Sequence, residues 1–238
     1  MSTLAAANDG WGGSDRLIGI EAVQGSTFAD TIAGDTAANQ LDGLDGHDSM
    51  NGADGNDTLN GGLGNDSLEG GTGDDVVAGN DGDDVIKGGQ GRDYLLGGAG
   101  NDSLALTPSG SWSSSYRAQS DFLVAAGVQS ATNKLVALTG MNRFETVSNG
   151  GDGSDAVSLT SGNDALFVDD AFSQLNAQAA AEVGRLVAME SIDAGAGDDL
   201  VDLTTIKFAL SGFAVQGGAG NDTIWGGQGT DVINGGDA

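Results

Sequence analysis

Residues 61–69, GGLGNDSLE, are followed without a gap by residues 70–78, GGTGDDVVA. Counted from the first Gly, position 4 is Gly, position 6 is Asp and position 8 is apolar in both nonapeptides. The same register holds from Gly25 to Ala105, in units that begin at Gly25, Gly34, Gly43, Gly52, Gly61, Gly70, Gly79, Gly88 and Gly97. A fixed period of nine predicts a repeat architecture in which each unit stacks on its neighbours.

Each unit is predicted to form a short strand at positions 7–9. Side chains alternate along a strand, so only position 8 would face inward. The inward residues would be Ile32, Leu41, Met50, Leu59, Leu68, Val77, Ile86, Leu95 and Leu104. One apolar side chain for nine ordered residues, several of them Gly, is too little burial to offset the lost chain entropy. The array therefore needs another source of stability.

The composition indicates a cation. The 238 residues include 43 Gly and 35 Asp or Glu against 8 Lys or Arg, with a formal charge of −27. This charge excludes nucleic acid and anionic membrane surfaces, which require basic patches. The absence of Cys excludes disulfides and thiolate metal sites. Calcium suits such a chain, because it binds carboxylate and carbonyl oxygens and couples binding to folding.

Targeting and membrane signals are missing from the sequence. The first residues lack the charged and apolar regions of a cleaved signal peptide, and no apolar run reaches the roughly 18 residues of a membrane span. Residues 235–238 begin a further repeat, so we interpret the chain as part of a longer protein.

The nonapeptides resemble the haemolysin-type (RTX) calcium-binding repeats of bacterial proteins exported by type I secretion. The resemblance covers residues 25–105, 150–167, 194–202 and 217–236. It implies an all-β fold, a right-handed parallel β-roll (a calcium-binding β-solenoid) in which two units make one coil. It also implies a secreted or cell-surface location. The chain would be unfolded in the calcium-poor cytoplasm and would fold on binding calcium outside.

In that family each calcium ion lies between turns 18 residues apart. The ligands implied are Asp at position 6 of both turns, the carbonyls of positions 2 and 4 of the first turn, and those of positions 1 and 3 of the second. Five pairs are well formed: Asp48/Asp66, Asp66/Asp84, Asp84/Asp102, Asp57/Asp75 and Asp75/Asp93. The second half adds Asp155, Asp164, Asp199, Asp222 and Asp231 at position 6. The implied backbone and other ligands are Leu44, Gly46, Ala53, Gly55, Gly61, Gly62, Leu63, Gly64, Gly70, Gly71, Thr72, Gly73, Gly79, Asn80, Asp81, Gly82, Gly88, Gln90, Gly97 and Ala99. Phe28 and Asn39 depart from the pattern and weaken sites at their turns.

The expected organisation has four parts: a lead-in at residues 1–24, a first roll at 25–106, a linker or insertion at 107–149, and a second, interrupted roll at 150–238 that is either separate or continuous with the first. We expect a hairpin of strands at 122–126 and 134–138, and a short helix from Asp170 to Gly184. Three apolar-Glu-x-apolar stretches, at 20–23, 144–147 and 189–192, are interpreted as strands that start each repeat run.

The sequence contains none of the common hydrolase motifs. His47, the single His, lies at position 5 of a turn and is interpreted as structural; Tyr94, Trp112 and Trp225 are assigned to local packing. We therefore expect a non-catalytic calcium-binding roll. The alternatives are a glycan-binding, adhesin or S-layer module, and an accessory domain of an extracellular enzyme or toxin.

Overall fold

The computed structural model describes residues 4–5, 16–17, 21–111, 115–118, 134–144, 146–168, 186–203, 212–227 and 229–237. The chain divides into two compact units. Unit 1 comprises Met1–Thr107, Thr146–Val157 and Val187–Met189, and unit 2 comprises Pro108–Glu145, Ser158–Leu186 and Glu190–Ala238. All regular elements in the described residues are β-strands. No helix among them has the length and apolar character to cross a membrane.

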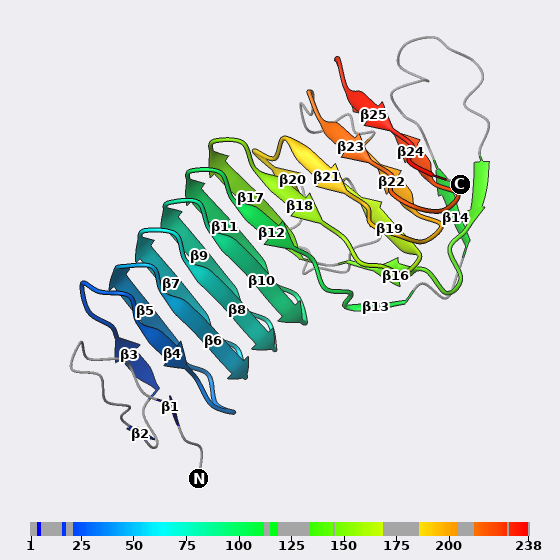
Figure 1. Cartoon of the computed structure of the whole chain (residues 1–238). Helices are drawn as coiled ribbons and strands as arrows, with labels where there is room; N and C mark the ends of the chain where they lie inside the picture. The colour runs from blue at the N-terminus through cyan, green and yellow to red at the C-terminus, as the bar shows by residue number, and fades with distance from the viewer. Residues whose placement is uncertain are drawn as a thin grey trace. The chain divides into compact units, whose positions relative to one another are not determined.

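Unit 1 is built from two parallel sheets whose strands alternate along the chain (Figure 1). The even sheet contains, in order, β4 (Thr31–Ala33), β6 (Ser49–Asp54), β8 (Ser67–Thr72), β10 (Val85–Gln90), β12 (Ser103–Ala105) and β18 (Ala156–Ser158). The odd sheet contains β3 (Ala22–Gln24), β5 (Gln40–Asp45), β7 (Thr58–Leu63), β9 (Val76–Asp81), β11 (Tyr94–Ala99) and β17 (Val147–Asp152). At the β4 edge, β1 (Leu4–Ala5) pairs antiparallel with β4 on one side and with β2 (Arg16–Leu17) on the other.

Neighbouring strands of one sheet are two repeats apart in sequence. Ile86 pairs with Leu68 on one side and with Leu104 on the other. Two repeats therefore make one coil, and the fold is the parallel β-roll that the sequence predicted. All nine predicted inward residues, from Ile32 to Leu104, are at most 2% exposed. The core of unit 1 is this double row of position-8 side chains.

The strands are longer than predicted. β7 runs through positions 7–9 and continues through positions 1–3 of the next repeat, and the other full strands do the same. Gly62, at position 2, has φ 118°, a backbone conformation that suits Gly. The chain therefore bends within the strand without leaving the sheet, and only positions 4–6 remain as the turn.

Residues 146–157 extend unit 1, although residues 108–145 separate them from the first repeats. Tyr94 pairs with Val147 and Gly98 pairs with Gly151, so β17 has the register of a regular repeat. The unit boundaries differ here from the expected start of a second roll at residue 150. The starting stretches also differ from one another: Val23 pairs with Leu41 at position 8, whereas Val147 lies at position 7.

Unit 2 contains a parallel sheet of β16 (Asn142–Arg143), β19 (Asp164–Phe167), β22 (Leu200–Asp202) and β24 (Thr223–Trp225), with β13 (Gly110–Ser111) antiparallel at its edge. Its other strands are β21 (Ser191–Asp193), β23 (Ala214–Gln216) and β25 (Val232–Asn234), which are parallel, and the antiparallel pair β14 (Ser115–Ala118) and β15 (Lys134–Ala137). The remaining strand, β20 (Leu186–Val187), spans the point where the sequence passes from unit 2 to unit 1.

The sheet of β19 and β22 is buried on both faces. All residues of these two strands are buried, which a roll strand with one solvated face would not show. Leu138 packs with Ala165, Phe167 and Leu200, and Trp225 lies partly buried against this cluster. Trp225 thus has the packing role that the sequence suggested. The expected strand at 134–138 corresponds to β15, whereas residues 122–126, Trp112 and the expected helix from Asp170 lie outside the described residues.

Candidate metal sites in the turns

Hydrogen bonds join position-6 aspartates of successive turns on the same side of the roll, 18 residues apart in sequence. The backbone N–H of Asp66 donates to Oδ1 of Asp84 (2.8 Å), and that of Asp84 donates to Oδ1 of Asp102 (2.9 Å). The same bond joins Asp48 to Asp66 (2.7 Å), Asp57 to Asp75 (2.8 Å) and Asp75 to Asp93 (3.1 Å). All five pairs named from the sequence are therefore brought together, each through one carboxylate oxygen.

The second carboxylate oxygen of these aspartates is buried and, within the described residues, accepts no hydrogen bond. This is true of Oδ2 in Asp48, Asp57, Asp66, Asp75, Asp84 and Asp102. Asp84 is only 1% exposed. A buried carboxylate oxygen without a donor is costly, because it has lost its water and gained nothing in exchange. A row of such oxygens indicates a place for positive charge.

Burial also makes these carboxyls hard to ionise. It raises the pKa of Asp57 and Asp84 to about 6, and that of Asp93 to about 7, with neighbouring carboxylates adding to the rise. The pKa values of Asp48, Asp66, Asp75 and Asp102 are raised by burial as well. The fold without a counter-ion therefore favours protonated side chains here.

Backbone oxygens border the same spaces between the turns. An ideal Cβ on Gly79, at position 1, would lie 2.0 Å from Oδ2 of Asp84 and 2.8 Å from the carbonyl oxygen of Gly97 in the neighbouring strand β11. An ideal Cβ on Gly64, at position 4, would lie 1.6 Å from the carbonyl oxygen of Gly46 in the previous turn. Glycine is required at these positions because oxygens occupy the volume that a side chain would need.

The carbonyls of position 3 face back toward the preceding turn. Those of Leu63 and Asp81 accept hydrogen bonds from the position-4 N–H groups of Gly46 (2.8 Å) and Gly64 (2.7 Å). The same bond reaches Thr72, Gln90 and Ala99 from Gly55, Gly73 and Gly82. Position 2 has the left-handed conformation even without Gly, since φ is 79° at Leu44, 78° at Ala53 and 80° at Asn80. Position 2 therefore keeps one backbone conformation from Leu44 to Gly98, whereas Ser26 and Asp35 in the first two repeats are not among the residues with positive φ.

The available donors are oxygens. The described part of the chain has no group of three or more His, Cys, Asp or Glu side chains that could hold a metal ion. A site must therefore combine one or two carboxylates with backbone carbonyls. Calcium accepts this mixture, with ligand distances of about 2.3–2.6 Å, whereas zinc and copper prefer imidazole or thiolate. The residues present fit calcium.

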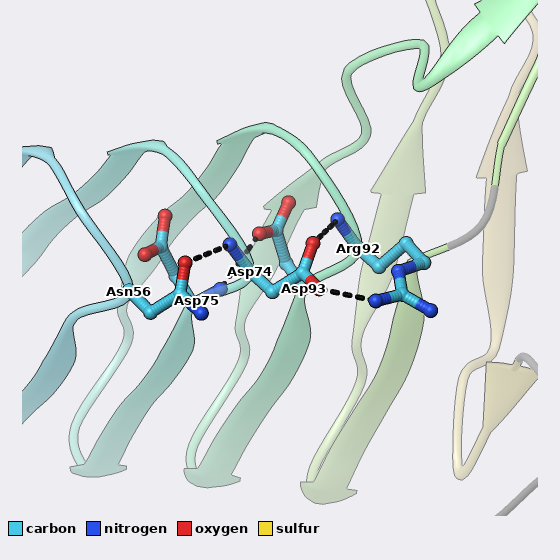
Figure 2. Close-up of polar contacts among 5 residues, drawn as sticks. All are labelled: Asn56, Asp74, Asp75, Arg92 and Asp93. Carbon is cyan, nitrogen blue, oxygen red and sulfur yellow. Dashed lines mark hydrogen bonds and ion pairs between the residues drawn. The ribbon is translucent and has the colours of Figure 1, made fainter. Parts of the chain in front are cut away.

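A second series of hydrogen bonds at position 5 was not predicted from the sequence. The Oδ1 of Asn56 accepts the backbone N–H of Asp74 (3.1 Å), and Oδ1 of Asp74 accepts that of Arg92 (3.0 Å). Figure 2 shows this series beside Asp75 and Asp93. Arg92 also forms an ion pair with Asp74, and this hydrogen bond holds the pKa of Asp74 below its usual range. The sequence does carry a signal for this series, because most residues at position 5 are Asn or Asp, whose side-chain oxygens can accept a backbone N–H.

His47 belongs to the position-5 series. Its Nδ1 accepts the backbone N–H of Asn65 (2.7 Å), and Oδ1 of Asn65 in turn accepts that of Asp83 (3.2 Å). The geometry requires an unprotonated Nδ1. The structural interpretation of His47 is consistent with this contact.

Further pairs of position-6 aspartates are not 18 residues apart in sequence, because insertions separate their repeats. The N–H of Asp102 donates to Oδ1 of Asp155 (2.8 Å), 53 residues away. In unit 2, the backbone N–H of Asp164 donates to Oδ1 of Asp199 (2.8 Å), 35 residues away, and the N–H of Asp199 donates to Oδ1 of Asp222 (3.1 Å), 23 residues away. Burial raises the pKa of Asp199 to about 7, and its Oδ2 accepts no hydrogen bond within the described residues. These pairs enlarge the set found from the sequence.

Three position-6 residues have different surroundings. Asp231 accepts the N–H groups of Gly212 and Phe213 (3.2 Å each), so its neighbour in the stack is not a carboxylate. Asn39 donates its N–H to Oδ1 of Asp57 (2.7 Å) and so continues the series without a charge. Asp164 has donors on both oxygens.

Comparison with known families gives one match. The model for the RTX calcium-binding nonapeptide repeat (4 copies) matches residues 17–50, 24–59, 34–68, 51–86, 69–104 and 214–237. No curated protein matches the chain. The family match covers both the first array and the last repeats, and its description is of a calcium-binding repeat.

Proposed function

Residues 17–104 and 214–237 are RTX calcium-binding nonapeptide repeats, and from this premise we propose that the chain is a non-catalytic β-roll that folds on binding calcium. It would form part of a larger protein exported by type I secretion to the outside or surface of a bacterium. The observation that supports this most strongly is the row of buried Oδ2 atoms without donors. Calcium would supply the positive charge that these oxygens lack.

Each ion would be held between turns on the same side of the roll. For one site, between the turns that follow β7 and β9, the ligands would be Asp66 and Asp84 with the carbonyls of Gly62, Gly64, Gly79 and Asp81. The other pairs would repeat this arrangement. Binding would replace like-charge repulsion between stacked carboxylates by attraction to a shared cation, and metal binding would thereby stabilise the fold directly.

The coupling of folding to calcium binding would suit a chain that is exported before it folds. With a formal charge of −27 and little apolar burial, the calcium-free chain would remain extended at neutral pH. An extended chain can pass through a secretion channel, and folding would follow on meeting about millimolar calcium, the range of weak extracellular calcium modules.

Calorimetric titration of the chelator-treated chain tests this proposal. We expect several calcium ions per chain and a large heat, because binding and folding occur together. Magnesium serves as the control, since it requires a smaller octahedral site and keeps its water. Absence of calcium uptake, or equal uptake of magnesium, would exclude calcium-driven folding.

A second candidate function is attachment to a glycan or cell surface. Tyr94 and Val76 are adjacent on the outer face of the odd sheet and are 40% and 41% exposed. An exposed aromatic ring beside an apolar side chain could stack on a sugar. A glycan array with the calcium-loaded chain and its Tyr94→Ala variant would test this, and binding unaffected by the substitution would count against this face.

A further inference from the structure

The turn that contains Asp164 in unit 2 is closed by protein donors. The backbone N–H of Thr160 donates to Oδ2 of Asp164 (2.7 Å), and the Thr160 hydroxyl lies 2.9 Å from both carboxylate oxygens. The side-chain amide of Asn142 donates to Oδ1 (2.6 Å). Asp164 is fully buried. Both of its oxygens are therefore satisfied without a cation.

The next turn of the same sheet provides the contrast. Asp199 accepts the N–H of Asp164 through Oδ1 (2.8 Å), while its Oδ2 is buried and accepts no hydrogen bond within the described residues. Asp222 likewise has a buried Oδ2 without a donor there. Of the three stacked aspartates, Asp164, Asp199 and Asp222, only Asp164 has hydrogen-bond donors on both carboxylate oxygens.

The residue at position 2 explains the difference. In the open turns, position 2 has positive φ, as at Gly62 (118°) and Gly218 (95°). Thr160 occupies position 2 of the Asp164 turn and is not among the described residues with positive φ. A β-branched residue disfavours that conformation. Its N–H instead points into its own turn and reaches the carboxylate four residues later.

The first repeat of unit 1 uses the same device. Ser26, also at position 2, donates its N–H (2.6 Å) and its hydroxyl (2.9 Å) to Oδ2 of Asp30. The shared sequence is Ser or Thr followed by Asp four residues later. Oδ1 of Asp30 is buried and accepts no hydrogen bond within the described residues, so Ser or Thr at position 2 closes the Oδ2 side of the turn and does not by itself satisfy both oxygens.

The Asp164 turn has a further donor, Asn142, that the Asp30 turn lacks among the described residues. It pairs with Asp164 in the register of β16 and β19, so it stands where an interior turn has a second carboxylate. Its amide nitrogen also reaches the Thr160 hydroxyl (3.2 Å). A neutral donor therefore replaces a second negative charge, which removes both the repulsion and the need for a shared cation.

We propose that Thr160 and Asn142 take the place of calcium at Asp164, so that the first turn of this stack in unit 2 assembles without an ion. This rests on the proposed function, because it divides the position-6 aspartates into those that bind calcium and one that does not. Two residues are then the determinants: Ser or Thr at position 2 closes Oδ2, where Gly or another residue with positive φ leaves it open, and Asn142 supplies the donor for Oδ1.

Counting bound calcium in the full-length chain by equilibrium dialysis tests this inference. Asp199→Asn should lower the count by at least one ion, whereas Asp164→Asn should leave it unchanged. An equal loss in both variants would overturn the inference. If the unsubstituted chain bound no calcium, the proposed function would fail, and the inference with it.

A gain of binding provides the second test, in case Asp164→Asn does not fold. Thr160→Gly combined with Asn142→Asp opens the turn and supplies a second carboxylate, and we expect one additional ion. Thr160→Val is the matched control, because it removes the hydroxyl but keeps the branched shape and the N–H, and it should add none. An unchanged count in the double variant would overturn the inference.

Discussion

The N–H of Asp66 donates a 2.8 Å hydrogen bond to Oδ1 of Asp84, and the other oxygen of Asp84 is buried without a donor among the described residues. One oxygen of each such aspartate therefore stabilises the stack, and the other is available to an ion. Asp48, Asp57, Asp66, Asp75 and Asp102 also have a buried Oδ2 without a donor among the described residues.

Asp84→Asn should weaken calcium-induced folding. The substitution keeps the Oδ1 acceptor for Asp66 but removes the charge that two neighbouring pairs share. We expect the calcium midpoint to rise about tenfold, since calcium affinity follows the number of charged ligands. Asp83→Asn is the matched control. It removes the same charge at position 5 and keeps the acceptor for Asn101 (2.8 Å), so its midpoint should stay near that of the original chain. Equal shifts would contradict the assignment.

Position 5 should contribute to stability independently of calcium. Asn65→Ala removes the acceptor of the Asp83 N–H. We expect the free energy of unfolding in saturating calcium to fall by about 0.5–1.5 kcal/mol, the usual contribution of one hydrogen bond. Asn65→Asp retains Oδ1 and should be nearly neutral. Chemical denaturation measures both, and an Ala variant as stable as the parent would show that this series is incidental.

Glycine at position 4 should be indispensable within the stack. An ideal Cβ on Gly64 would lie 1.6 Å from the carbonyl oxygen of Gly46, and φ is 121°. Gly64→Ala should therefore cost about 1–3 kcal/mol from the backbone alone, with the steric overlap added. An ideal Cβ on Gly235 would meet nothing within 4 Å, so Gly235→Ala is the control. Similar thermal midpoints for the two variants would disprove the close approach of the turns.

Acid should partly replace calcium. Burial raises the pKa of Asp84 to about 6 and of Asp93 to about 7, from an ordinary value of 3.8. A raised pKa in the fold means that protonation favours the fold. The stability that these groups give the metal-free roll is fully present below 3.8 and is lost as the pH rises through about 6 to 7.

Circular dichroism of the chelator-treated chain would detect this effect. We expect more β-structure near pH 5 than near pH 7.5, with ultracentrifugation to exclude aggregation close to the pI of about 4.1. A metal-free chain with the same spectrum at both pH values would contradict the link between these buried carboxyls and folding.

Much of the roll follows from local rules in the sequence. Ile32 and the eight other predicted inward residues are buried because the repeat fixes their position on the strand. The five aspartate pairs follow from the same period, since two repeats make one coil. Strand length did not follow, because positive φ at residues such as Gly62 keeps positions 1–3 in the sheet.

Long-range pairing was beyond the sequence. Asp155 pairs with Asp102 across 53 residues, and no period reveals which repeat will stack on which after an insertion. The Asp164 turn was grouped with the calcium sites because its Gly162-Asn163-Asp164 matches the motif. What sets it apart is Asn142, from the insertion, together with the backbone direction at Thr160.

Calcium is expected to be part of the folded roll, and far-ultraviolet circular dichroism at about pH 7.5 is the most direct test of whether the roll folds without it. Spectra of the full-length chain in excess calcium and in excess chelator should differ: β-structure with calcium, and an unfolded spectrum without it. β-Structure of equal strength in chelator would contradict the claim, because the buried carboxylates would then be accommodated by the protein alone.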